Sequence, residues 1–154
     1  MAQMIANLKF KKLTSTAIEP SRERNTDAGI DLYATRKARI ASGGREVLLT
    51  GYAVQIPEGY YGQIEERSGF STQNTLKLKA GVIDSEYRGE IGVVFQNCGF
   101  YPVDIEPGDK IAQLVIHRQP KVTFTFVDEL DPSDREDNGF GSSDKKDNYP
   151  RITL

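Results

Sequence analysis

The chain has 154 residues, of which 38% are hydrophobic and 27% charged, proportions typical of one globular domain with a sizeable core. Its formal net charge of -2 argues against wrapping of duplex nucleic acid, because a protein that does so needs a basic face. No apolar run is long enough for the core of a signal peptide or for a membrane span. We therefore expect a cytoplasmic protein whose partners include neither nucleic acid nor a membrane.

Apolar residues alternate with polar ones through much of the chain, which is the periodicity of half-buried β-strands. Turn sequences containing glycine or proline separate these segments, so the predicted fold class is all-β, a sandwich or a barrel. The alternating segments are 91–95, 103–105, 110–116 and 122–126, and the turn sequences are 42–44, 57–59 and 106–109. Helix signals are confined to residues 71–75, with Ser68 and Ser71 as candidate caps.

The composition changes abruptly after Asp128. Residues 131–143 are first charged and then rich in glycine and serine, so this end has too few apolar residues to fold alone. We therefore expect one domain over residues 1–130 and a flexible C-terminal arm over residues 131–154. Phe140 is flanked by glycines, which favours an arm that a ligand or a neighbouring subunit orders.

Arg67, Ser68 and Gly69 form a segment suited to binding phosphate. Arginine offers a planar fork of donors, serine adds a hydroxyl group, and glycine lets the backbone approach a ligand closely. Taken alone, however, the three residues fit an ordinary surface turn better.

Asp31 stands between two apolar residues, where an unpaired carboxylate is costly. It should therefore have a structural partner or help to hold a hydrated divalent cation. Beside a phosphate ligand that cation would be Mg2+, which binds through few protein oxygens and several waters.

The segment from Gly81 to Gly89 joins an apolar pair to a polar turn. Asp84 follows that pair directly, so a strand should hold its carboxylate in place, where it could act as a general base. Tyr87 could present a flat face to a sugar or a ring. The alternative is a hairpin closed by Gly89 with a solvated acidic tip, and the residues alone favour that alternative.

Two other kinds of site are excluded. The phosphate-binding pattern G-x-x-x-x-G-K-[ST] does not occur in the sequence. His117 and Cys98 are the only histidine and the only cysteine, so neither a His/Cys zinc site nor an intrachain disulfide can form. Cys98 is expected to be a small, half-buried side chain in a strand.

Five segments, taken in order, resemble the ordered motifs of the trimeric dUTPase family. They are AGIDLYA at 28–34, RSG at 67–69, GVIDSEYRGEIGV at 81–93, GDKIAQLVI at 108–116 and R-x-x-x-GFGSS at 135–143. The resemblance implies a distorted jelly-roll β-sandwich or barrel, assembled as a homotrimer whose active sites are shared and closed by the arm. It also implies hydrolysis of dUTP to dUMP and pyrophosphate with Mg2+, which keeps uracil out of DNA and supplies dUMP for dTMP synthesis.

The resemblance also implies a role for individual residues. Asp84 would be catalytic, activating the attacking water and contacting the sugar, and Tyr87 would pack beneath the deoxyribose. Asp31 would support the metal. The other residues implied in substrate binding are Gly81, Val82, Ile83 and Gly92 for uracil, Arg67, Ser68, Gly69 and Gln113 for phosphate, and Arg135, Phe140, Gly141 and Ser142 in the closing arm.

The chain departs from the family pattern chiefly in the arm. Glu136, Asn138 and Asp144 occupy positions where the family usually has glycine, and two added carboxylates are unfavourable near a triphosphate. Leu78 stands where some members use an asparagine for uracil, which leaves that recognition to the backbone. Two alternatives stay open: a nucleotide enzyme resembling dCTP deaminase, and a dUTP-gated protein-binding module on the same fold.

Overall fold

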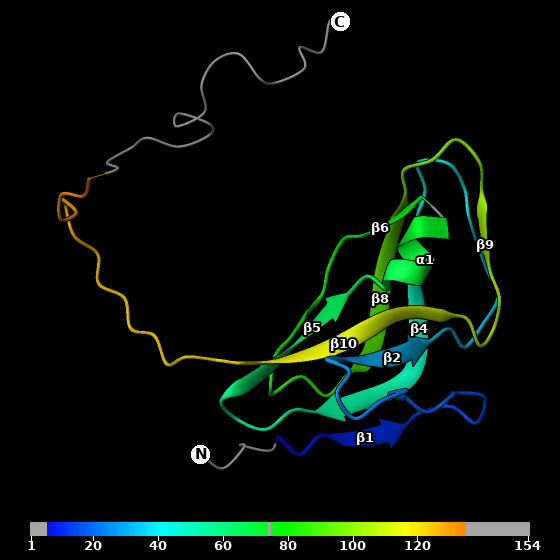
Figure 1. Ribbon diagram of the computed structural model, residues 1–154, viewed down its shortest axis with the longest axis horizontal. Helices are drawn as coiled ribbons and strands as arrows, with labels where there is room; N and C mark the ends of the chain where they lie inside the picture. The colour runs from blue at the N-terminus through cyan, green and yellow to red at the C-terminus, as the bar shows by residue number, and fades with distance from the viewer. Residues whose placement is uncertain (1–5, 74, 135–154) are drawn as a thin grey trace, which may run out of the picture. The chain divides into compact units, whose positions relative to one another are not determined.

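The computed structural model describes residues 6–73 and 75–134. The chain divides into two units, Met1–Lys121 and Val122–Leu154, which we describe separately. The described residues of the first unit form ten strands and one short helix (Figure 1). These are β1 (Lys9–Lys12), β2 (Gly29–Tyr33), β3 (Ala38–Ile40), β4 (Arg45–Gln55), β5 (Tyr60–Glu65), α1 (Ser68–Gln73), β6 (Leu76–Leu78), β7 (Val82–Ile83), β8 (Glu90–Asn97), β9 (Val103–Ile105) and β10 (Lys110–Arg118).

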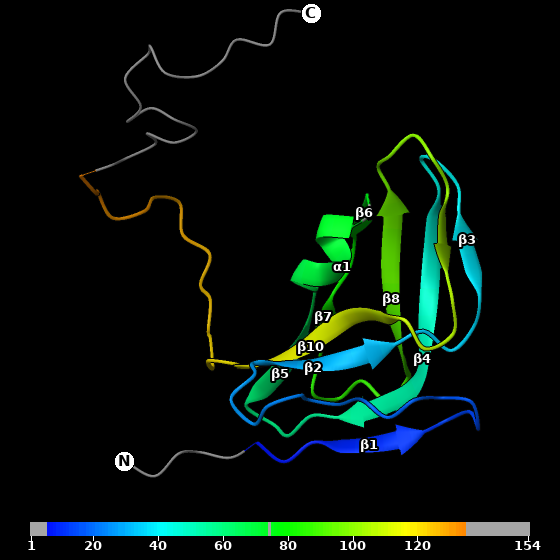
Figure 2. The same ribbon diagram turned by 45° about the vertical axis from the view of Figure 1, so that its right-hand side comes forward.

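Two four-stranded sheets and a two-stranded ribbon make up the first unit, and all their strand pairs are antiparallel. One sheet has the order β1-β4-β8-β6, the other β2-β10-β5-β7, and β3 pairs with β9 (Figure 2). Buried apolar side chains from both sheets and from the ribbon form one core cluster. No helix among the described residues is long and apolar enough to span a membrane.

Strand β8 shows why alternation predicted the fold. Ile91, Val93 and Phe95 are buried, whereas the residues between them are only partly buried. The alternation expected at residues 91–95 is therefore confirmed. Val94, the apolar residue on the outer face, pairs with Val47 of β4.

Strand β4 bends at Gly51, so that one strand pairs with β8 in one part and with β1 in another. Gly51 has a φ of 72°, and a Cβ there would collide with the side chain of Ala17. The backbone N–H of Gly51 donates to Oε1 of Glu90 (2.7 Å), and the Thr50 hydroxyl donates to the carbonyl of Ile91 (3.0 Å). These two hydrogen bonds connect the bend in β4 to the start of β8.

The hairpin expected at residues 81–89 is wrong. Strand β7 pairs with β5 in one sheet, whereas β8 pairs with β4 and β6 in the other. The segment between β7 and β8 therefore crosses from one sheet to the other, through a turn in which the N–H of Tyr87 donates to the carbonyl of Asp84 (3.1 Å). Two buried isoleucines, Ile83 and Ile91, hold its two ends in opposite sheets.

Three further expectations differ from the structure. Cys98 lies just after β8 and is exposed, because β8 ends at the buried Asn97 and the chain turns there. The helix begins at Ser68 rather than at residue 71, directly after Arg67. The half-buried strand expected at residues 122–126 is wrong: these residues form no strand and all are exposed, because no other segment of the described chain pairs with them.

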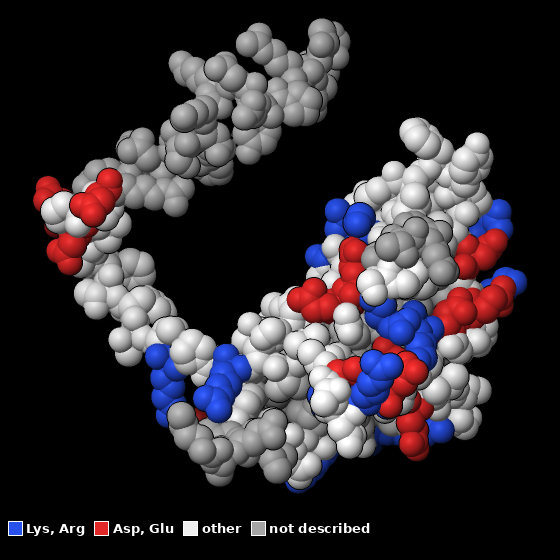
Figure 3. Space-filling model, viewed as in Figure 1, with Lys and Arg blue, Asp and Glu red and all other residues white. Residues whose placement is uncertain are grey.

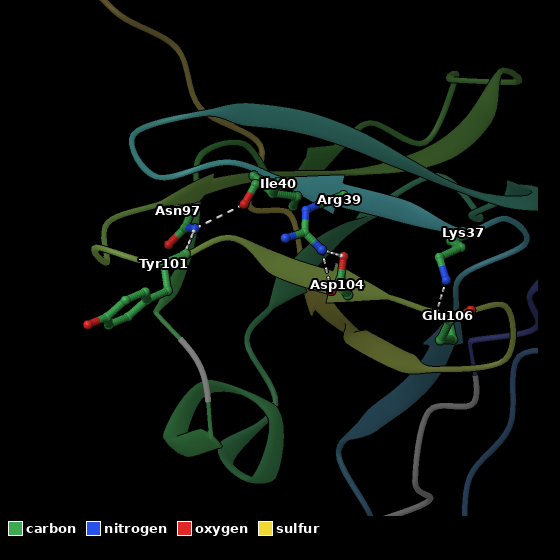
Figure 4. Close-up of polar contacts among 7 residues, drawn as sticks. All are labelled: Lys37, Arg39, Ile40, Asn97, Tyr101, Asp104 and Glu106. Atoms are coloured by element: carbon green, nitrogen blue, oxygen red, sulfur yellow. Dashed lines mark hydrogen bonds and ion pairs between the residues drawn. The ribbon is translucent and has the colours of Figure 1, made fainter.

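Asn97 ties the ribbon of β3 and β9 to the turn that follows β8 (Figure 4). Its fully buried amide donates to the carbonyls of Ile40 (3.0 Å) and Tyr101 (2.7 Å). Its Oδ1 accepts from the Thr75 hydroxyl (2.6 Å) and from the N–H of Gly99 (2.9 Å). One side chain thus satisfies four groups, including one just after α1.

Replacing Asn97 should destabilise the fold more than replacing a neighbouring amide side chain that is less buried. In Asn97→Ala four groups, among them the buried carbonyl of Ile40, lose their hydrogen bonds to a fully buried amide, so we expect the free energy of unfolding to fall by about 2–4 kcal/mol in urea titrations. Gln96→Ala is the matched control, because Gln96 lies next to it on the outer face of β8 and should cost about 0.5 kcal/mol or less. Equal losses in the two variants would contradict this account of Asn97.

Candidate active site

The residues predicted for uracil and sugar binding line one pocket of about 160 Å³. It lies where the chain leaves β7 and crosses to β8. The predicted residues in its wall are Gly81, Val82, Ile83, Asp84, Tyr87 and Gly92, and they are joined by Ile64, Ala80 and Ile91. The wall combines apolar side chains with backbone groups and one carboxylate.

Short strand pairing positions this pocket. β7 pairs with β5 through Ile83 and Val82, and the N–H of Ile64 donates to the carbonyl of Gly81 (2.7 Å). The backbone of residues 81–83 is therefore held by β5 on one side, while β7, at the edge of its sheet, leaves its other side for a ligand. This arrangement suits recognition of a flat ring by backbone donors and acceptors.

Tyr87 is held beside Asp84 by the inter-sheet turn. Its hydroxyl donates to the carbonyl of Glu90 (3.0 Å), and its ring lies against Gly89, where a Cβ would collide with the phenol. Arg88 closes the turn by donating to the carbonyls of Ser85 (2.6 Å) and Tyr87 (2.9 Å). Asp84 is exposed, so its carboxylate is open to water and to a ligand.

The residues predicted for phosphate and metal line a second pocket of about 290 Å³. Its wall contains Asp31, Arg67, Ser68, Gly69 and Gln113, together with Glu23, Asp27, Ala28 and Gly29. Strand pairing brings them together, because Gln113 of β10 lies opposite Asp31 of β2 on one side and Glu65 of β5 on the other.

The carboxylate of Asp31 forms ion pairs with two basic side chains. Nε of Arg67 lies 2.7 Å from its Oδ1, and Nζ of Lys110 lies 2.9 Å from its Oδ2. The hydrogen bond to Asp31, and then the attraction of its charge, hold the pKa of Lys110 above its ordinary value. Asp31 thus has the structural partner that its apolar neighbours demand. In the view of Figure 3, basic and acidic side chains lie side by side on the surface.

Two residues that support this pocket, Lys110 and Glu66, were not predicted from the sequence. Lys110 carries a signal that could have identified it, because a carboxylate between apolar residues requires a cation and β10 begins with one. Glu66 accepts the N–H of Leu78 at Oε1 (3.0 Å), and its carbonyl accepts Nε2 of Gln113 (3.0 Å). No pattern in the sequence pointed to Glu66, because its contacts join three separate segments.

The two pockets share no residue among those described. In the single chain the predicted site residues that are described therefore fall into two groups, one in each pocket. The predicted arm residues Arg135, Phe140, Gly141 and Ser142 lie outside the described residues.

A family model described as dUTPase matches residues 15–144. The chain belongs to the dUTPase family. The deoxyuridine 5'-triphosphate nucleotidohydrolase of Corynebacterium glutamicum is 42% identical over 144 residues, which cover 92% of this chain and 97% of that protein. The protein of the same name from Arabidopsis thaliana is 36% identical over 135 residues, covering 88% of this chain and 81% of that protein. The resemblance seen in the five motifs is confirmed.

Solved dUTPase structures share this fold. The dUTPase of Staphylococcus bacteriophage 80alpha with dUpNHpp superposes with a TM-score of 0.83 at 31% identity, covering 89% of this chain and 98% of that one. A mutant dUTPase from phage phi11 of S. aureus, described with a structural Mg(II) ion, superposes with a TM-score of 0.75 at 29% identity, covering 80% of this chain and 98% of that one. The expected all-β jelly-roll class is confirmed.

The ion pairs of Asp31 should contribute more to stability than an exposed pair. The side chains of Asp31 and Arg67 are 14% and 29% exposed, whereas those of Asp104 and Arg39 are 48% and 63% exposed. We expect Asp31→Asn to lower the free energy of unfolding by about 1–3 kcal/mol and Asp104→Asn by about 0.5 kcal/mol, measured in urea without nucleotide. A larger loss in Asp104→Asn would contradict this ranking.

Proposed function

We propose that the chain hydrolyses dUTP to dUMP and pyrophosphate, which keeps uracil out of DNA and supplies dUMP for dTMP synthesis. One observation carries this proposal: every described residue that the motifs assign to substrate lines one of the two pockets. One pocket has the backbone edge and flat ring that a nucleoside needs. The other has the guanidinium, hydroxyl and amide groups that phosphate oxygens need.

Selectivity for the nucleoside is proposed to come from residues 81–87. Backbone donors and acceptors at Gly81, Val82 and Ile83 would match the imide and carbonyl groups of uracil, with Gly92 close by. The ring of Tyr87 would lie beneath the deoxyribose, where a 2′-hydroxyl would collide with it. Stacking of the Phe140 ring on the base, worth about 1–3 kcal/mol, would favour closure of the arm.

Catalysis is proposed to depend on Asp84 and on the phosphate pocket. The Asp84 carboxylate would accept a proton from the attacking water and hold that water in line with the scissile phosphorus–oxygen bond. Arg67 and Gln113, with Ser68 and Gly69, would stabilise the charge that develops on the phosphate oxygens. Arg135, Gly141 and Ser142 of the arm would exclude bulk water from the closed site.

Mg2+ fits this pocket as a companion of the substrate. The described residues contain no group of three or more His, Cys, Asp or Glu that could hold a metal ion. Each oxygen of Asp31 already faces a cation, but a carboxylate has about four acceptor positions, so a contact through water is still possible. When bound, the ion would neutralise charge on the triphosphate.

A homotrimer with shared active sites accounts for the separation of the two pockets. A second subunit would bring its phosphate pocket beside the nucleoside pocket of the first. The outer face of β4 and β8 supports self-association, because Val47 and Leu49 are 44% and 36% exposed and pair with Val94 and Gly92. The cytoplasmic location expected from the sequence stays a prediction.

Asp84→Asn should separate binding from hydrolysis. The amide keeps the shape of the side chain but cannot accept the proton, so we expect the rate of pyrophosphate release from dUTP to fall by about 10²–10⁴-fold. The affinity for dUpNHpp, measured by calorimetry, should change little. Glu86→Gln is the control, because Glu86 is exposed in the same turn and should leave both quantities unchanged. Near-normal hydrolysis by Asp84→Asn would rule out Asp84 as the base.

Product analysis decides between the enzymatic alternatives. The wild-type chain should release pyrophosphate from dUTP, and not from UTP, dTTP or dCTP. Release of ammonia from dCTP, without pyrophosphate from dUTP, would identify a deaminase instead. Binding of dUTP with no turnover would favour the protein-binding module.

Mixing two inactive variants tests whether the sites are shared. Asp84→Asn damages one pocket and Arg67→Ala the other, so each alone should be nearly inactive. If the pockets of different subunits meet, unfolding and refolding the two together should give about a quarter of the wild-type activity, because random assembly restores that share of sites. No recovery from mixed trimers would show that one chain supplies both residues.

A further inference from the structure

Gly29 lies on the face of β2 that lines the phosphate pocket, two residues before Asp31. Successive side chains of a strand point to opposite faces, so positions 29 and 31 share one face. The strand β10 runs beside it, with Gln113 opposite Asp31 and Val115 opposite Gly29. Gln113 is therefore the diagonal neighbour of Gly29 on that face.

The side chain of Gln113 occupies the space that any side chain at position 29 would need. A Cβ on Gly29 would collide with Oε1 of Gln113 and would lie 2.7 Å from its Cδ and 2.9 Å from its Cβ. Turning the amide alone would not relieve the contact with Cβ. The backbone of Gly29 is not in the left-handed region that favours glycine, so the requirement here is space and not conformation.

The position of Gln113 over Gly29 is coupled to the loop that carries the phosphate-binding residues. Nε2 of Gln113 donates to the carbonyl of Glu66 (3.0 Å), the residue before Arg67. Within residues 6–73 and 75–134 the amide donates only this one hydrogen bond, so its second N–H would be available to a ligand. Displacing the amide would thus disturb both a phosphate donor and its link to the Arg67 segment.

We propose that Gly29 is a positioning residue for phosphate binding, and that it acts by leaving the space in which the Gln113 amide lies. This proposal rests on the proposed function, because it assigns Gly29 to the same site. It adds a residue that contacts no substrate atom and whose contribution depends wholly on Gln113.

The test compares ligands with and without phosphates. In Gly29→Ala we expect dUpNHpp to bind about tenfold more weakly or worse, because a donor to a charged group is displaced. Deoxyuridine, which has no phosphate, should bind within about twofold of wild type. A general loss of stability would weaken both ligands alike, so the ratio of the two affinities isolates the phosphate contribution.

Gly59→Ala is the matched control. Gly59 has a φ of 84° and a Cβ there would meet open space, so the substitution strains the backbone without reaching either pocket. It should lower the melting temperature and leave both affinities unchanged.

A double-mutant cycle decides whether Gly29 acts through Gln113. In a Gln113→Gly background, which removes the amide and also the Cβ that lies 2.9 Å from the added methyl group, Gly29→Ala should weaken dUpNHpp binding by less than about twofold. The same tenfold loss in both backgrounds, or no loss in either, would overturn the proposal. If Gly29→Ala alone does not fold, the double variant still decides: recovered folding supports the proposal, and failure to fold overturns it. A wild-type chain that does not bind dUpNHpp would instead refute the proposed function.

Discussion

Strand β10 lies between β2 and β5, and the phosphate pocket depends on this double pairing. The pairing places Gln113 opposite Asp31, while Asp31 joins Arg67 from beyond β5 to Lys110 at the start of β10. Three segments far apart in sequence thereby share one small cluster of charges. Because each cation satisfies one oxygen of a mostly buried carboxylate, the guanidinium group is oriented before any ligand arrives, which lowers the entropy that binding must overcome.

The nucleoside pocket depends on a different constraint, the passage of the chain from one sheet to the other between β7 and β8. The turn there holds Tyr87 and leaves Asp84 exposed beside a backbone edge. The pocket thus combines a rigid frame with an accessible carboxylate. The two pockets are lined by different residues, and under the proposed function the single chain would divide recognition of the nucleoside from recognition of phosphate, which assembly into a trimer would unite.

Sequence patterns predicted the fold class because burial on one face of a strand leaves a period of two. Ile91, Val93 and Phe95 follow that rule closely. The same rule was wrong about residues 81–89, since short-range patterns do not reveal which sheet a strand joins. Cys98 was misplaced because a buried asparagine, Asn97, ends β8 one residue before it.

The sequence by itself determined the family and the all-β class and predicted the groups that do the chemistry, because these depend on residue type, order and spacing. The tertiary structure alone decided which groups meet. It paired Asp31 with both Arg67 and Lys110, and it placed Gln113 over Gly29. Such contacts follow from strand register between distant segments, and no local pattern encodes them.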